Sequence, residues 1–447
     1  MKSAKFAVLL LILITVNIIK AQDFPSEYPL ELKIYPFEFP YNISGGYSYF
    51  GMNQLVQNSE SWTIFIHETF GNLLISSGCN DLFAFFFLGI YNISIDQHLP
   101  LGSQWMYQEA HRSVLGSNDV ESADSIYEFD FNVSDKKVYE VSDSELAYFH
   151  DTHPVEFIRS VTAGSELTIV KSTELKKNYF YSGKSLKFIL PNLWINQINL
   201  FWNLQFSSIS TINDSIDDLN TKEKNIKDRD FSGPEFTTWV YELYHMDEPY
   251  SNRGIHPSGT GYNRYISYSD LSKDEIDYLT RVTYLMLLNF ASPQMLGINR
   301  MEISETENIY LNFSFMTFLT PFGYTVDFNL MSKIKVLDFS ITYHSYVNND
   351  KYFPGVDFEI YRLPLWFIND NFYAGGLISV WNQPDELLFN TEKSMLGGMI
   401  KGELIYKYND KFEFFSECGF KTEGWVAGQL SLDNEFTFGI GLNVLMY

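Results

Sequence analysis

The C-terminal stretch EFTFGIGLNVLMY, residues 435–447, alternates between large apolar residues and polar or small ones. Phe436, Phe438 and Ile440 fall on one side of an extended chain, while Glu435 and Thr437 fall on the other. This period of two predicts a strand with one apolar face. The same alternation recurs in seven segments upstream, at residues 311–315, 326–330, 337–343, 356–361, 372–381, 396–408 and 412–421.

Residues 301–447 therefore predict about eight consecutive strands. Turn-like clusters at 348–350, 369–371, 382–385 and 409–410 separate several of them, as in hairpins. We expect an antiparallel β-barrel, because closure leaves no edge strand unpaired. With the helical patterns upstream, the fold class is α+β, an N-terminal helical unit packed on this barrel.

The composition indicates where the apolar strand faces point. Aromatic residues make up 17% of the chain, with 39 Phe and 30 Tyr. A water-soluble domain gains little from so many large rings, whereas a membrane barrel uses them in its girdles. We therefore expect the apolar faces to contact lipid and the polar faces to point inward. The 31 basic residues against 55 acidic ones argue against nucleic acid as a partner, because phosphate binding needs a basic surface.

The N-terminus predicts export from the cytoplasm. Lys2 and Lys5 precede an apolar run from Ala7 to Ile19, and Ala21-Gln22 is a plausible cleavage point. Residues 1–21 are therefore predicted to be a signal peptide, with an uncleaved anchor as the alternative. Residues 22–300 are predicted to be a mainly helical unit that begins with a Pro-rich, extended segment on the surface, and residues 301–447 the barrel.

Three features of the helical unit carry specific expectations. The run from Leu82 to Ile90 is apolar all round and too short to span a bilayer, so we expect it to be buried, with embedding at an interface as the alternative. The run 185–210 predicts a helix whose asparagine stripe faces partners rather than lipid. Ser232 with Glu235 three residues later predicts a capping box.

A polar cluster around His67-Glu68 and the segment 107–112 is the main candidate for chemistry. His67 and His111 are candidate ligands of a divalent metal such as zinc, with Glu68 or Glu109 as general base. The pattern invites comparison with His-Glu-x-x-His zincins, but Tyr107 stands in the first histidine place and a glutamine in the glutamate place. The alternative is a buried hydrogen-bonded network that holds helices together.

A second candidate is the Gly-rich loop 252–264. His256 beside Arg253 and Arg264 is typical of a pocket for a small anion or carboxylate, and the alternative is a rigid loop that seals the barrel mouth. Cys79 and Cys418 make no disulfide framework or zinc-ribbon spacing, and their pairing stays open.

The cleavage point, the strand series and a last strand ending in Tyr447 resemble those of Gram-negative outer-membrane proteins. Because such barrels commonly end on an aromatic that their assembly machinery recognises, the resemblance implies that machinery as a partner. The Ala-Gln cleavage style and the segments 108–115, 228–239 and 254–265 resemble secreted or envelope proteins of the Bacteroidota. That resemblance implies no activity, but it implies relatives with a fuller His-Glu-x-x-His, which would make this chain an altered member.

The sequence therefore predicts an outer-membrane protein of the cell envelope, in contact with membrane lipid, with a structural or ligand-binding role. The first alternative is an envelope hydrolase acting on a lipid, peptide or glycan through the degenerate site. The second is a soluble periplasmic protein with a lipocalin-like barrel.

Overall fold

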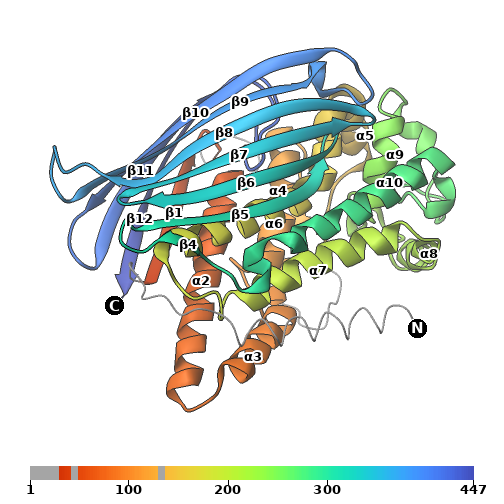
Figure 1. Ribbon diagram of the computed structural model, residues 1–447. Coiled ribbons are helices and arrows are strands. Elements are labelled where there is room, and N and C mark those ends of the chain that lie inside the picture. Colours follow the sequence, from red (N-terminus) through yellow and green to blue (C-terminus); the bar gives the residue numbers. More distant parts are fainter. Residues whose placement is uncertain (1–29, 42–48, 129–135, 447) are drawn as a thin grey trace.

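The computed structural model describes residues 30–41, 49–128 and 136–446, and these residues fold as α+β. Helices dominate up to residue 296, and a large antiparallel sheet follows (Figure 1). The predicted signal peptide, residues 1–21, and the terminal Tyr447 lie outside the described residues. The predicted boundary at 301 coincides with the start of the first strand that follows the helices.

The sheet has ten strands in the order β1-β12-β11-β10-β9-β8-β7-β6-β5-β4. Their bounds are β1 Leu30–Phe39, β4 Met301–Ser304, β5 Ile309–Thr320, β6 Gly323–Ile334, β7 Leu337–Asn348, β8 Lys351–Pro364, β9 Phe372–Pro384, β10 Ser394–Lys407, β11 Phe412–Lys421 and β12 Glu435–Met446. From β4 to β12 each strand pairs with the next, so the predicted meander is confirmed. The order ends at β1 and β4, and no pairing among the described residues joins these two strands, so closure into a barrel is not confirmed.

Strand β1 corrects the expectation for the N-terminal segment. The segment is extended, as predicted, but it does not simply lie on a surface: it pairs antiparallel with β12, from Leu30 opposite Met446 to Phe39 opposite Phe438. Pro36 falls where the register shifts, between Ile34 and Phe37. A residue without an N–H is tolerated at such an irregularity, which is how a Pro-rich segment joins the sheet.

The helices fill the side toward which the sheet curves (Figure 1). Their bounds are α2 Met52–Ser76, α3 Asp81–Ser94, α4 Ser103–Ser117, α5 Asp143–Thr152, α6 Pro154–Ser182, α7 Leu190–Ser207, α8 Ile212–Lys222, α9 Glu235–Tyr244 and α10 Lys273–Leu285, with the short 3-10 helix η6 at Met286–Ala291. Two short strands, β2 Ala123–Asp124 and β3 Val138–Tyr139, form a separate sheet. Helix α6 contacts β5 and β6, and α2 lies along β1. The main hydrophobic core joins helix residues such as Trp239 to strand residues such as Leu319.

Helix α3 contradicts the preferred expectation that its apolar run is buried. Ala84 and Leu88 are buried against Phe188, but Phe83, Phe86 and Ile90 are exposed. The helix packs on α2 and α7 with one face only, which leaves the other face open. The stretch Asp81–Ser117, which comprises α3, a turn and α4, passes a test of length and composition for crossing a membrane, with 33% of its most apolar window buried.

Candidate functional site

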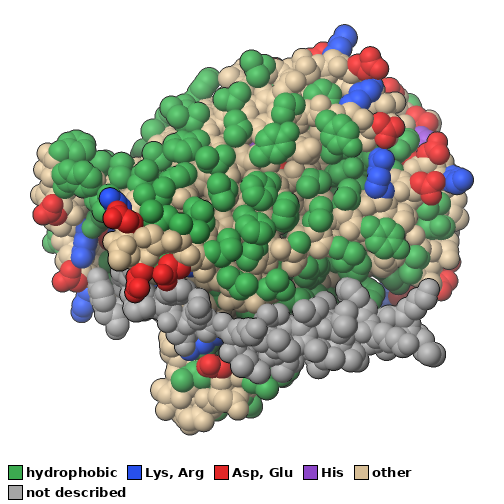
Figure 2. Space-filling model, in the orientation of Figure 1, with side chains coloured by type: hydrophobic (Ala, Val, Ile, Leu, Met, Phe, Trp, Pro, Cys, Tyr) green, Lys and Arg blue, Asp and Glu red, His purple; other side chains and the backbone are tan. Residues whose placement is uncertain are grey.

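The outer face of the sheet, the one that points away from the helices, is apolar and exposed (Figure 2). On β12 the predicted alternation is confirmed, because Phe436, Phe438 and Ile440 are exposed while Glu435 is half-buried and Asn443 is buried. On the other strands, the exposed side chains of this outer face include Phe328, Ile341, Tyr343, Val356, Phe358, Ile378, Val380, Leu396, Ile400, Leu404, Tyr406, Phe412, Phe414 and Phe420. The outward residues named here are all apolar or tyrosine, so the part of the face that they form offers no charge to a partner.

The inner face of the sheet carries many polar and charged residues beside apolar ones such as Met316 and Leu377. Its residues face α2 and α6 and include Asp327, Asn329, Thr342, His344, Asp357, Glu359, Ser379, Lys401, Glu403 and Glu417. A soluble protein turns polar strand residues toward water, whereas here the outer face is apolar and the carboxylates and lysines point inward. We call this arrangement the inverted polarity of the sheet. The two sides of each strand therefore meet different surroundings.

Near both ends of the strand order, side chains from the helical part bond backbone groups of β1 and β5 that no neighbouring strand pairs. At β1 the side chain of Asn58, on α2, accepts from the backbone N–H of Tyr35 at 2.9 Å and donates to its carbonyl at 2.9 Å. At β5 the side chain of Asn289, on η6, accepts from the N–H of Thr317 at 2.6 Å and donates to its carbonyl at 3.1 Å. Each asparagine reproduces the pair of bonds that a neighbouring strand makes. Ser61 on α2 adds an acceptor for the backbone N–H of Lys33.

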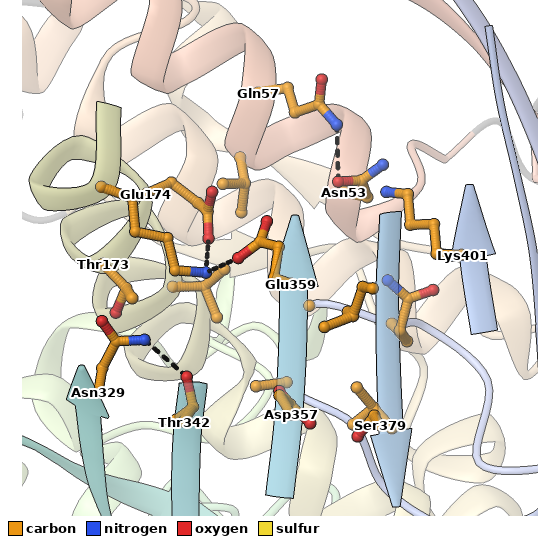
Figure 3. Close-up of a pocket in the computed structure, with 18 of the residues that line it drawn as sticks. Asn53, Gln57, Thr173, Glu174, Asn329, Thr342, Asp357, Glu359, Ser379 and Lys401 are labelled. Atoms are coloured by element: carbon orange, nitrogen blue, oxygen red, sulfur yellow. Dashed lines mark hydrogen bonds and ion pairs between the residues drawn. The ribbon is translucent and has the colours of Figure 1, made fainter. Parts of the chain in front are cut away.

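A cavity of about 300 Å³ lies between the inner face and helices α2 and α6 (Figure 3). Across it, the Lys177 ammonium contacts Glu359 at 2.6 Å and Glu174 at 3.1 Å. His344 lies between Asp327 at 2.9 Å and Asp357 at 3.0 Å. The cavity wall therefore presents charges that are already paired across helix and sheet.

Lysines on two strands are paired in the same way. The Lys33 ammonium contacts Glu403 at 3.1 Å, and the Lys401 ammonium contacts Glu417 at 2.9 Å. Every lysine of the cavity wall thus contacts at least one carboxylate. Each lysine ammonium group is therefore already paired, and an anionic ligand would have to displace a carboxylate to reach it.

The first predicted pair, His67-Glu68, lies on α2 and is used within the protein. In the buried His67 ring, Nδ1 lies 2.7 Å from the carbonyl oxygen of Phe188 and Nε2 lies 3.1 Å from the amide oxygen of Asn92, and burial lowers its pKa. The Glu68 carboxyl accepts from the Tyr179 hydroxyl at 2.6 Å, and burial raises its pKa. Both residues hold helices together, as the predicted alternative described.

The second predicted pair, Glu109 and His111, lies on α4 and is also buried. Glu109 contacts Arg112 at 2.7 Å, and burial raises its pKa. His111 bonds the Ser160 carbonyl at 2.5 Å through Nδ1, and its Nε2 lies 3.1 Å from Glu235. Burial opposes the charged form, but the Glu235 carboxylate raises the pKa of His111 above its ordinary value.

These two pairs do not converge on a metal in the part of the chain that the structure describes. The ring nitrogens of His67 and of His111 are engaged by other groups, and the described residues contain no cluster of three or more His, Cys, Asp or Glu side chains placed to hold an ion. Because His67 and His111 each have their own partners, the predicted zinc site has no ligand set there.

The prediction for Glu235 was wrong. This residue was expected to close a capping box with Ser232, but Pro234 is the N-cap of α9 and the Ser232 hydroxyl bonds the carbonyl of Gly233. Glu235 instead accepts from the Tyr107 hydroxyl and contacts His111, beside a pocket of about 570 Å³. No local signal gives this contact, because α4 and α9 are far apart in the sequence.

The asparagine stripe of α7 is divided between two surroundings. Asn192 and Asn196 are buried and bond to each other and to Asn92. Asn199 and Asn203 are exposed and line the pocket beside Glu235. The stripe thus faces protein at Asn192 and Asn196 and a pocket at Asn199 and Asn203.

The loop 252–264 is tied down by its own ion pairs. Arg253 contacts Glu242, and Arg264 contacts Asp143 at 2.7 Å. The His256 ring bonds the Ser258 hydroxyl at 2.9 Å. Since both guanidinium groups already have carboxylate partners, the loop matches the predicted rigid segment better than the predicted anion pocket.

Cys79 and Cys418 are both free. Cys79 lies in the turn between α2 and α3, and Cys418 lies on β11 opposite Phe438, on the outer face of the sheet. Comparisons of this chain with protein-family models, with curated proteins and with solved structures find no match, so the function is argued from these residues alone.

Proposed function

We propose that this protein is an outer-membrane protein of the cell envelope, whose sheet contacts lipid hydrocarbon with its outer face and encloses a ligand cavity with its inner face. The strands are the segments that cross the bilayer in this proposal. The observation that carries it is the inverted polarity of the sheet, from exposed residues such as Phe436 and Ile378 to inward ones such as Glu417 and Asp357. Alternation of apolar-out and polar-in residues is the pattern of membrane strands.

The bonds from helix side chains to the backbones of Tyr35 and Thr317 support the same proposal. In hydrocarbon each unpaired backbone group costs several kcal/mol, so an open strand edge is not tolerated there. Asn58 and Asn289 remove that cost at β1 and β5. From β1 the contacts run through α2, α3, α7 and η6 to β5. In place of the predicted closed barrel, we therefore propose a ten-stranded sheet whose two ends are joined by helices.

The exposed side of α3 belongs to these connecting helices. Phe83, Phe86 and Ile90 are exposed on α3, which contacts both α2 and α7, so they add an apolar surface to the helices that connect β1 with β5. A lipid contact satisfies these side chains as it satisfies those of the strands. The alternative of an envelope hydrolase has no comparable support, because His67 and His111 are held apart by their own buried partners.

Cys418 provides a test that uses the native chain. The variant Cys79→Ser leaves Cys418 as the one thiol, on the outer face of β11 and exposed in the protein by itself. In lipid vesicles we expect a membrane-impermeant maleimide to label it at least tenfold more slowly than after unfolding in urea. Cys418 is exposed among the described residues, so slow labelling in vesicles is the result that lipid contact predicts.

The control variant has its one thiol at a position off the sheet. Tyr148→Cys in a Cys79→Ser/Cys418→Ser background places a thiol on α5, at a side chain that is 70% exposed. It should label at the same rate in vesicles and in urea. Cell fractionation and heat-modifiable migration of the detergent-extracted protein complete the test. Rapid labelling of Cys418 in vesicles, or recovery of the protein in the detergent-free supernatant, would instead support the soluble periplasmic alternative.

A further inference from the structure

The cavity between the sheet and helices α2 and α6 has an unbalanced set of hydrogen-bonding groups. Among the described residues of its wall, the buried side-chain polar atoms without a partner are all oxygen acceptors; they belong to Gln57, Glu60, Asn329 and Asp357. None of them is an N–H donor. A molecule that satisfies this wall must therefore bring hydrogen-bond donors.

Asn329 shows that this is more than a collection of acidic side chains. It is 1% exposed, its amide nitrogen donates to Thr342 at 2.6 Å, and its amide oxygen has no donor. Figure 3 shows this amide reaching from β6 toward α6, on the side where Thr173 and Glu174 lie. A buried amide oxygen without a donor costs free energy unless something occupies the space before it.

The charge of the wall selects among donors. Its titratable side chains are Glu31, Glu60, Glu174, Asp327, Asp357, Glu359, Glu403 and Glu417 against Lys33, Lys177, Lys401 and His344. The three lysines and the histidine are all paired with carboxylates, so acidic groups remain in excess. Even with Glu60 protonated, the acidic side chains of the wall outnumber the basic ones, and this excess favours a cation over a neutral donor.

The rest of the lining indicates what kind of cation fits. Val56 and Ile64 on α2, Ile169 on α6, and Leu377 and Met399 on the sheet supply aliphatic surface between the acidic groups. Methylene groups pack against such side chains, whereas a bare metal ion does not. The volume of about 300 Å³ is at the small end of ligand pockets.

From these observations we infer that the cavity binds an aliphatic diamine or polyamine, with an ammonium group hydrogen-bonded to Gln57 and Glu60 on α2 and the methylene chain against the aliphatic lining. The two anchors are three residues apart on one helix, so both oxygens lie on the same face. This deepens the ligand-binding part of the proposed function, but it does not depend on lipid contact.

The inference predicts that ligand binding releases a proton from Glu60. Burial, followed by the nearby Glu174 carboxylate, raises the pKa of Glu60 to about 8, with Glu31 acting in the same direction and Lys33 and Lys171 opposing it. Glu60 is therefore mostly protonated at neutral pH in the unoccupied protein. An ammonium group beside it favours the ionised form, so binding at pH 7 should release a proton.

The experiment is titration calorimetry of the detergent-solubilised full chain with putrescine, an aliphatic diamine, and with butanediol, its neutral counterpart. We expect the diamine to bind and the diol to bind at least tenfold more weakly. Glu60→Gln should weaken diamine binding at least tenfold and abolish the proton release that is measured by comparing buffers of different ionisation enthalpy. Glu307→Gln, in an exposed turn where Glu307 pairs with Lys335, makes the same charge change and should leave binding unaltered.

Each other outcome overturns the inference. Equal binding of the diol would show that charge is not required, and undiminished diamine binding by Glu60→Gln would show non-specific attraction to an acidic protein. Calcium or magnesium that displaces the diamine at equimolar concentration would assign the cavity to a metal. If the diamine does not bind, the cavity is a water-filled space and not a diamine site. If Glu60→Gln fails to fold, Gln57→Leu tests the other anchor. If only the proposed lipid contact is wrong, the protein will be soluble in water and will still bind the diamine.

Discussion

The two faces of strand β7 are made by neighbouring residues, yet they are stabilised in different ways. Tyr343 points outward and is 51% exposed, whereas the adjacent His344 points inward and contacts Asp327 and Asp357. The inner face gains its stability from specific partners within the protein. The outer side chains contact one another, as Phe315 and Phe328 do with ring centroids 5.4 Å apart, and their exposed surfaces meet whatever surrounds the molecule. Changes on the inner face should therefore act in any solvent, and changes on the outer face only in lipid.

The largest effect should come from breaking an inner contact that joins helix and sheet. Glu166 on α6 is fully buried and contacts Arg159 at 3.1 Å, the Trp425 indole nitrogen at 3.1 Å and the Gly428 N–H at 2.8 Å. Glu166→Leu leaves these donors buried without their acceptor. We expect the free energy of unfolding in detergent to fall by about 3–5 kcal/mol, as measured by urea denaturation.

The matched variant Glu166→Gln keeps one side-chain oxygen and should lose less than Glu166→Leu. A loss below about 1 kcal/mol for Glu166→Leu would mean that the buried pair does not anchor the 422–434 connection to α6.

The next effect belongs to the outer face. Ile378 on β9 is 54% exposed, so in water Ile378→Lys should change the free energy of unfolding by no more than about 0.5 kcal/mol. In a bilayer the same lysine faces hydrocarbon and should cost about 2–4 kcal/mol if it lies near the midplane. Reversible urea unfolding in lipid vesicles measures it.

Tyr148→Lys on α5 is the control for Ile378→Lys, because its site is even more exposed but lies off the sheet. A similar small effect of both variants in vesicles would place the outer face of β9 in water and remove the difference between the faces.

The sequence predicted the faces of the strands well because a period of two is local. The exposed Phe436 and the inward Asn443 could be assigned without knowing what each would contact. The same logic failed for β1, since its prolines obscure the pattern and its partner is at the other end of the chain. It also failed for α3, where an apolar run does not reveal whether another element covers it.

The candidate site was less predictable because it depends on approaches between distant elements. Nothing local tells that Asn58 will bond the backbone of Tyr35 or that Asn289 will bond that of Thr317. Glu60 was not among the candidate site residues, yet it lines the cavity from helix α2. Motif reasoning instead favoured His67, whose cluster is a structural one.

The smallest effect should separate two adjacent lysines on α6. Lys176 is buried, its ammonium contacts the sulfur of Met316 at 3.4 Å, and burial lowers its pKa to about 7. Burial opposes the charge of Lys177 as well, but Glu174 and Glu359 hold the pKa of Lys177 well above its ordinary value. We expect Lys176→Met to stabilise the protein by about 1–3 kcal/mol at pH 7, and Lys177→Met to destabilise it by a similar amount.

The pH dependence distinguishes the two lysines further. The folded pKa of Lys176 lies below the unfolded one, so the unfolded chain binds more protons between about pH 7 and pH 10 and the wild type gains stability as pH rises. The advantage of Lys176→Met should therefore shrink over that range. For Lys177 the folded pKa is raised, so its contribution is fully present below the unfolded pKa and is lost only as pH rises through the folded one. Urea denaturation at pH 7 and pH 9 checks both, and an advantage of Lys176→Met that stays constant with pH would mean that Lys176 is not buried as a neutral amine.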